Sequence, residues 1–278
     1  MSGEERLLTE CVLPTPAERD IYRRSEANIR RLSEILPEDL VIDLAREVIL
    51  RVASKENSLS HISYTVDEED IKALCLAVVS DDETAGARII SDLRAVGVRP
   101  EDIYLRQLAA AARMLGEMWV KDELTFSQVT VGTGRMFAIM RSMRHLFEPS
   151  KPAQDKTAIF AAVPGEDHTL GVHMAADFFR KEGWQIALKV GMDHDQLVAE
   201  IKQAPTGIVG LSISGEHSIE ALSRLVVALR ITCPHAKLIV SGSNVEEVEP
   251  ILSLMGLDVI AASVEDAQEQ MTAMWNSD

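Results

Sequence analysis

Cysteine, aromatic residues and positive charge are all scarce in this chain of 278 residues. Its three cysteines, Cys11, Cys75 and Cys233, are scattered and odd in number, which favours neither a disulfide framework nor a zinc cluster and is typical of a reducing compartment. The apolar runs are too short to span a membrane, and the acidic N-terminus lacks the apolar stretch of a secretory signal. We therefore expect a cytoplasmic protein with no membrane partner.

Negative charge is abundant instead: the chain has 44 acidic and 28 basic residues, which gives a formal net charge of −16. Because binding to phosphates requires a basic face, direct nucleic-acid binding is not expected, and any effect on DNA would act through a protein partner. Hydrophobic residues make up 46% of the chain, enough for a packed core in each of about two domains.

A proline-containing segment at residues 148–154 divides two patterns. Before it the apolar residues follow helical spacing, and after it short apolar runs alternate with helical segments. We predict an N-terminal helical extension over residues 1–60, with two helices within 15–55, a helical-bundle cap over 61–148 and a Rossmann-like domain over 155–278. In the bundle, Asp67 and Thr125 are predicted to cap helices, and Pro100 to begin one.

Five short apolar runs predict the strands of the C-terminal part, at residues 157–163, 185–190, 207–212, 237–241 and 257–261. Helices are predicted at residues 170–182, 194–203, 217–231, 245–255 and 264–275. Parallel strands joined by helical crossovers predict an α/β, doubly wound, five-stranded sheet in the flavodoxin-like order.

The turn after the first strand carries Glu166 and His168, and Gly171 follows at the start of a helix. Ligands of such sheets bind at this carboxyl edge. The third and fourth strands end in small-residue turns, Ser212-Ile213-Ser214-Gly215 and Ser241-Gly242-Ser243-Asn244. Small side chains at adjacent strand ends would leave a slot beside the sheet that a bulky ligand can enter.

Several of these residues also have an ordinary structural interpretation. A histidine at a strand end, such as His168, is usually a polar loop residue, and His217 is usually solvated although it lies where it could approach a ligand. Trp119 lies on a helical seam, where tryptophan is more often core than cofactor contact. A group of methionines is typical of adaptable core packing and leaves ligand contact open: Met114, Met118, Met136, Met140 and Met143.

Taken in order, Glu166-x-His168-x-x-Gly171, the serine at the third strand end and the glycine turn at the fourth resemble the cobalamin-binding domain family. The preceding helices, with Gly116-Glu117-Met118-Trp119 before Leu124-Thr125, resemble its helical cap. The resemblance covers roughly residues 65–275. The family includes methionine synthase, corrinoid methyl carriers and light-responsive cobalamin regulators.

The resemblance implies that His168 ligates cobalt in place of the cofactor's own base, that Glu166 orients its ring, and that Ser212 bonds the carboxylate. It also implies that the displaced nucleotide tail runs down the slot and that Trp119 lies over the corrin ring. The implied cobalamin-binding residues are Glu166, Asp167, His168, Thr169, Gly171, Ser212, Ser214, Gly242, Ser243, Trp119 and Met118. Whether the cobalamin is the adenosyl, methyl or hydroxo form stays open.

The chain also departs from its relatives. Glu166 stands where many members have aspartate, and Gly242-Ser243 where they have two glycines. Light-sensing repressors carry Glu-His at the positions of Val129 and Thr130, so their upper-face chemistry does not carry over. The pattern is more similar to the short antirepressor-type regulators of purple bacteria, and related regulators hold heme or pair cobalamin with a bilin. A second tetrapyrrole, biliverdin or heme, is therefore left open.

On this resemblance we expect a cobalamin-binding photoreceptor in signal transduction and transcription regulation, rather than an enzyme, with no catalytic residue assigned. It would signal by rearrangement of the cap or of a homo-oligomer such as a dimer, toward a transcription regulator or an effector enzyme. The N-terminal extension, which methyl carriers do not require, favours this view. The alternative is the corrinoid carrier subunit of a methyltransferase system, and a third is a heme- or bilin-binding sensor.

Overall fold

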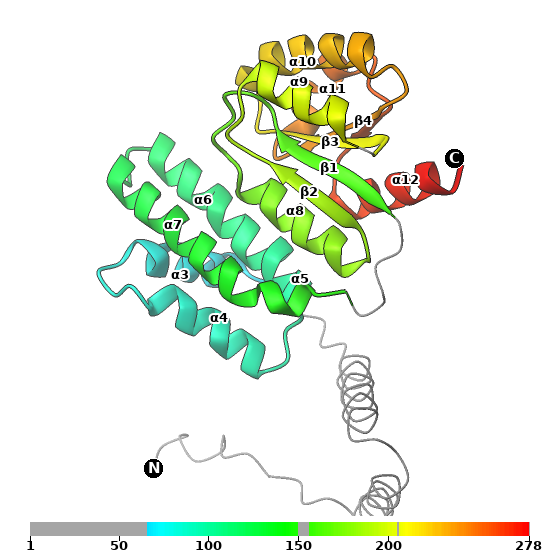
Figure 1. Ribbon diagram of the computed structural model, residues 1–278. Coiled ribbons are helices and arrows are strands. Elements are labelled where there is room, and N and C mark those ends of the chain that lie inside the picture. Colours follow the sequence, from blue (N-terminus) through cyan, green and yellow to red (C-terminus); the bar gives the residue numbers. More distant parts are fainter. Residues whose placement is uncertain (1–65, 150–155, 205, 278) are drawn as a thin grey trace, which may run out of the picture. The chain divides into compact units, whose positions relative to one another are not determined.

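The computed structural model describes residues 66–149, 156–204 and 206–277, which all belong to one compact unit over residues 62–278 (Figure 1). The helices predicted within residues 15–55 lie outside the described residues. Among the residues described, no helix has both the length and the apolar character needed to cross a bilayer.

Helices form the first part of this unit, as predicted. They are α3 (Glu68–Val79), α4 (Ala85–Ala95), α5 (Pro100–Asp102), η1 (Ile103–Leu108), α6 (Ala109–Val120), α7 (Phe126–Met143) and η2 (Arg144–Phe147). Both predicted caps are confirmed: the Asp67 carboxylate accepts a hydrogen bond from the Asp70 N–H, and Thr125 forms a reciprocal capping box with Gln128. The helix that begins at Pro100 passes through a π-helical segment, η1, which the apolar spacing did not predict.

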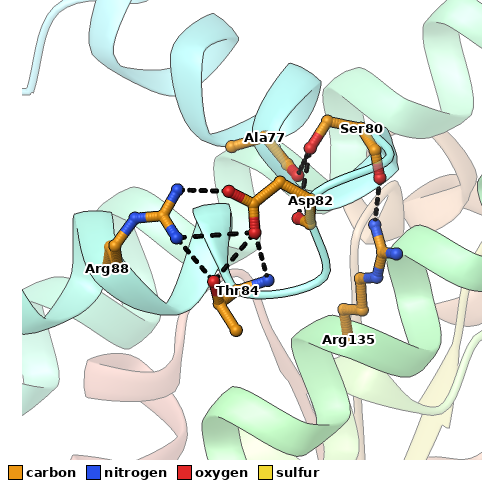
Figure 2. Close-up of polar contacts among 6 residues, drawn as sticks. All are labelled: Ala77, Ser80, Asp82, Thr84, Arg88 and Arg135. Atoms are coloured by element: carbon orange, nitrogen blue, oxygen red, sulfur yellow. Dashed lines mark hydrogen bonds and ion pairs between the residues drawn. The ribbon is translucent and has the colours of Figure 1, made fainter.

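Polar contacts hold the loop between α3 and α4 (Figure 2). The Asp82 carboxylate accepts hydrogen bonds from the Thr84 N–H, the Thr84 hydroxyl and the Arg88 guanidinium. From α7, Arg135 donates to the backbone carbonyls of Val78 and Ser80, at 2.9 and 2.5 Å. These bonds satisfy carbonyls at the end of α3 and fix the loop against α7.

The second part is the predicted five-stranded parallel sheet, with the strand order β2-β1-β3-β4-β5. Its strands are β1 (Thr157–Ala162), β2 (Gln185–Lys189), β3 (Ile208–Ile213), β4 (Lys237–Gly242) and β5 (Val259–Ala261). The crossover and terminal helices are α8 (Leu170–Lys181), α9 (His194–Gln203), α10 (Ile219–Thr232), α11 (Val245–Leu252) and α12 (Val264–Ser277), with a short 3-10 turn, η3 (Glu216–Ser218), before α10. This is the flavodoxin-like order, so the predicted fold class is confirmed.

Helices cover both faces of the sheet, as Figure 1 shows, and each face has its own apolar core. α9, α10 and α11 pack on one face, and α8 and α12 pack on the other. α8 also faces the bundle: Leu170 and Met174 belong to the bundle core, whereas Val172, Ala176 and Phe179 pack with the sheet. The first residues of α8 therefore lie where the bundle core meets the core on this face of the sheet. They come immediately after the turn that carries Glu166 and His168.

A polar group on α8 strengthens this contact. Asp177 is buried and bonds Arg180 at 2.9 Å and Arg144, which lies in η2, at 3.4 Å. The Tyr104 hydroxyl donates to the Met140 carbonyl and lies 3.4 Å from the Asp177 carboxylate. Burial, together with the Asp177 charge, raises the pKa of Tyr104, so the phenol stays protonated and donates at any physiological pH.

Candidate functional site

The turn between β1 and α8 is tied to the neighbouring strand before it reaches the site. The Val163 N–H donates to the Ser212 carbonyl at the end of β3, and the Glu166 N–H returns to the Val163 carbonyl. Gly165, between them, adopts φ +82°, a conformation that glycine takes without steric cost. The chain therefore reverses sharply enough to direct the Glu166 side chain into the sheet edge.

The Glu166 carboxylate is buried and accepts five hydrogen bonds. Oε1 accepts from the His168 N–H and lies 2.8 Å from the His168 Nδ1. Oε2 accepts from the Ser214 N–H at 2.9 Å, the Ser214 hydroxyl at 2.7 Å and the Ser218 hydroxyl at 2.6 Å. Burial alone would raise the pKa of Glu166, but the bonds from Ser218, Ser214 and His168 lower it to about 2. The carboxylate is therefore ionised at neutral pH.

This ionised carboxylate determines which nitrogen of His168 carries the proton. A carboxylate can only accept, so the Nδ1 atom that faces Glu166 must be the donor, and in a neutral ring Nε2 then keeps its lone pair. The His168 side chain is 68% exposed, which leaves Nε2 open to a ligand. An oriented imidazole with a free lone pair suits a transition metal such as cobalt, so the described residues fit the cofactor that the sequence pattern implies.

The expected role of Ser212 was wrong. Its register position opposite Ser241 places it within the strands, and the carboxylate takes its hydroxyl donors from Ser214 and Ser218. Sequence reasoning missed Ser218, although a hydroxyl just before the helix that follows the third strand is a signal for which one could search. The reason is local: Gly215 and the turn of η3 bring Ser218 back toward the β1 turn.

The other histidines have different surroundings. His217 is 58% exposed, and its Nε2 lies 3.2 Å from the Ser214 hydroxyl and 3.5 Å from Glu166 Oε2. His173 has a packing role, since its Nδ1 lies 2.8 Å from the Thr169 carbonyl and its ring contacts that of Phe137 in an edge-on arrangement.

The glycines of the predicted slot differ in what they allow. A Cβ on Gly242 would lie 1.8 Å from the Ile213 carbonyl oxygen, so this glycine permits the close approach of β3 and β4. Nothing lies within 4 Å of a Cβ on Gly171, so this glycine faces open space at the start of α8. Ser243 and Asp167 are exposed. The passage of a nucleotide tail along these residues stays a prediction.

Met118 and Trp119, the two residues of the helical bundle that are expected to contact cobalamin, lie in the last turn of α6. Trp119 is 46% exposed and contacts Phe126, itself 71% exposed, with ring centroids 6.4 Å apart. Trp119 therefore does not fill the bundle core, unlike Leu115 one turn earlier on the same seam. Met118 packs against the core instead, with its sulfur 3.6 Å from the Cys75 thiol.

Sequence comparison matches this chain to a protein family and to a bacterial protein. A family model described as the B12 binding domain matches residues 156–272. An uncharacterized 20.5 kDa protein of the bchF-crtJ intergenic region of Rhodobacter capsulatus is 22% identical over 175 residues, which are 62% of this chain and 91% of that protein.

A solved structure shares the fold. The monomethylamine corrinoid protein of Methanosarcina barkeri matches with a TM-score of 0.61 and 20% identity, over 75% of this chain and 100% of that one. A cobalamin-binding protein of Desulfitobacterium hafniense matches with a TM-score of 0.40 and 18% identity, over 76% of this chain and 99% of that one.

Proposed function

We propose that the protein binds cobalamin through His168, with the cofactor's own base displaced, and acts as a light-sensing regulator; the match of residues 156–272 to the B12 binding domain supports the cofactor. One observation carries the binding mode: an ionised, buried Glu166 holds the His168 Nδ1 at 2.8 Å and leaves Nε2 free. Bound alkylcobalamin would supply a cobalt–carbon bond that light can break.

The side chains around His168 have distinct parts in this proposal. Glu166 orients the imidazole, and Ser214 and Ser218 keep Glu166 ionised by donating to the oxygen that His168 does not use. Gly171 leaves open space for a ligand at the start of α8. Trp119, with its exposed ring, supplies an apolar surface for the upper side of the corrin.

Two observations bear on what the bound cofactor does. The corrinoid protein of Methanosarcina barkeri matches 75% of this chain and leaves a quarter without a counterpart, and an added segment suits a protein that reports to a partner. The chain's net charge of −16 directs the output toward a protein, such as a transcription regulator or effector enzyme, and a dimer would give the cap a second copy to contact. The same fold match favours the second candidate, a methyl-carrier subunit.

Absorption spectra and gel filtration of the cobalamin-loaded protein, in the dark and after illumination, separate these candidates. A regulator should show a light-dependent spectrum together with a light-dependent change in apparent size. A carrier should instead exchange its methyl group with a corrinoid methyltransferase, without a change in size. A bilin or heme spectrum in the purified protein would point to the third candidate.

The binding mode has its own variant test. His168→Ala should lose the spectrum of the nitrogen-ligated cofactor. His235→Ala, which removes an exposed histidine of the loop before β4, is the matched control and should leave that spectrum unchanged. Identical spectra for the two variants would reject His168 as the lower ligand.

A further inference from the structure

We propose that the corrinoid-free protein holds a divalent transition-metal ion, such as Zn²⁺, between Glu166, the Nδ1 of His168 and the Nε2 of His217. The inference goes beyond the proposed function, although it uses the same histidine. The three ligand atoms lie within 4.8 Å of one another, and they come from a buried carboxylate and two exposed imidazoles. Two histidines and a glutamate are a ligand set that Zn²⁺ takes in proteins.

The distances within the group fit a small tetrahedral ion. Bonds of about 2.0–2.1 Å to Zn²⁺ place neighbouring ligand atoms about 3.3 Å apart. Glu166 Oε1 lies 2.8 Å from His168 Nδ1, and the other carboxylate oxygen, Oε2, lies 3.5 Å from His217 Nε2. The Ser214 hydroxyl lies 3.1 Å from His168 Nδ1 and 3.2 Å from His217 Nε2, so it borders the site, and water can take the fourth position. Small shifts of exposed imidazoles would complete the site.

The charges around the group favour a cation. The buried Glu166 carboxylate is bonded by two hydroxyls, two backbone N–H groups and His168, and within the described part of the chain none of these donors is a lysine or arginine. Its negative charge therefore has no fixed cationic partner among the described residues, and a bound cation would neutralise it. Arg224, the nearby guanidinium, is paired with Glu220.

The ion has a route to this position. A cavity of about 240 Å³ opens beside His217 and is lined by Pro164, His194, Glu220, Ala221 and Arg224. His217 forms part of its wall, so an ion can reach Nε2 from solvent without movement of the sheet.

Occupation of this site would exclude cobalt ligation by the same ring. A neutral imidazole has one lone pair, and the bond from Nδ1 to Glu166 places that lone pair on Nε2, where cobalt would bind. An ion on Nδ1 moves the proton to Nε2 and removes that lone pair. The ion and the histidine-ligated corrinoid are therefore competitors, so metal supply would control loading of the cofactor.

Titration of tag-free, corrinoid-free protein with Zn²⁺, followed by calorimetry, tests the site. Co²⁺ titration adds a visible spectrum that reports coordination geometry. We expect one Zn²⁺ per chain, and His217→Ala should weaken its affinity by about tenfold or more. His194→Ala, in the same cavity but outside the ligand group, is the matched control and should bind Zn²⁺ as the wild type does. Equal affinities of all three proteins would overturn the site.

A competition experiment tests the exclusion and separates the two proposals. Zn²⁺ at a concentration that fills the wild-type site but leaves most of the His217→Ala protein unoccupied should slow and weaken the binding of cobalamin to the wild type and have little effect on the variant. Full cobalamin binding with Zn²⁺ still bound would overturn the exclusion. If the protein binds cobalamin through His168 but no Zn²⁺, the metal site alone is rejected; if it binds Zn²⁺ but no cobalamin, the proposed function alone fails.

Discussion

Replacing Glu166 by glutamine tests the hydrogen-bond network on which the site depends. The amide is nearly isosteric, but one of its two ends donates. If its NH₂ replaces Oε2, the Ser214 and Ser218 hydroxyls can rotate to accept, whereas the Ser214 backbone N–H is left facing a donor. The opposite orientation leaves the His168 N–H facing a donor and also forces the imidazole proton from Nδ1 to Nε2, so it costs more.

The magnitude follows from the cheaper orientation. One buried N–H loses its acceptor, at about 1–3 kcal/mol, and the remaining bonds lose the charge that strengthens them. We therefore expect Glu166→Gln to lower the free energy of unfolding by about 3 kcal/mol. It should also weaken ligation by His168, because the amide holds the Nδ1–H less strongly than a carboxylate does.

Urea unfolding of the corrinoid-free protein measures the first effect, and the absorption spectrum of the cobalamin-loaded protein measures the second. Glu220→Gln is the matched control, since this glutamate is exposed and pairs with Arg224 at the surface. A Glu166→Gln protein as stable as this control, with an unchanged spectrum, would refute the assigned network.

Three further predictions follow from single features. Gly242→Ala places a Cβ 1.8 Å from the Ile213 carbonyl oxygen, so it should destabilise the fold by about 3 kcal/mol or more, visible as a lower thermal midpoint; wild-type stability would contradict this packing. The pKa of Glu166 is lowered from 4.5 to about 2, so the stability that its ionised form gives the fold is complete above pH 4.5 and is lost as the pH falls toward 2. The loss is on the order of 3 kcal/mol, and the acid-unfolding curve of Glu166→Gln should lack it. Burial raises the pKa of the Cys75 thiol to about 11, so iodoacetamide at pH 8 should leave it unmodified in the folded protein and modify it in urea, as mass spectrometry can show.

The parts of the fold that were predictable are those governed by short-range rules. Asp67 and Thr125 cap helices because a short polar side chain reaches an N–H only three residues away. The alternation of strands and helices in the second half determines a parallel sheet, and chain order with right-handed crossovers leaves few strand orders to choose from. The prediction was less complete at η1, because a π-helical segment needs only one extra residue in a turn and leaves the apolar spacing nearly unchanged.

The site was predictable in its ligand but not in its supporting residues. Glu166 and His168 are two residues apart, so their contact is set by the local turn. Which serine reaches the carboxylate depends instead on the path from β3 into α10, and that path brings in Ser214 and Ser218 rather than Ser212. Helical spacing placed Trp119 on the seam, but it does not show that the helix ends there and exposes the ring.

The lower ligand of cobalt can be identified directly by electron paramagnetic resonance of the cobalamin-loaded protein in the Co(II) state. The unpaired electron couples to the axial nitrogen, so a natural-abundance ligand splits each cobalt line into a triplet. In protein grown with ¹⁵N-histidine and loaded with unlabelled cobalamin, ligation by His168 predicts doublets, and His168→Ala should lose them. Triplets that persist in the labelled protein would assign the ligand to the cofactor's own base and contradict the account.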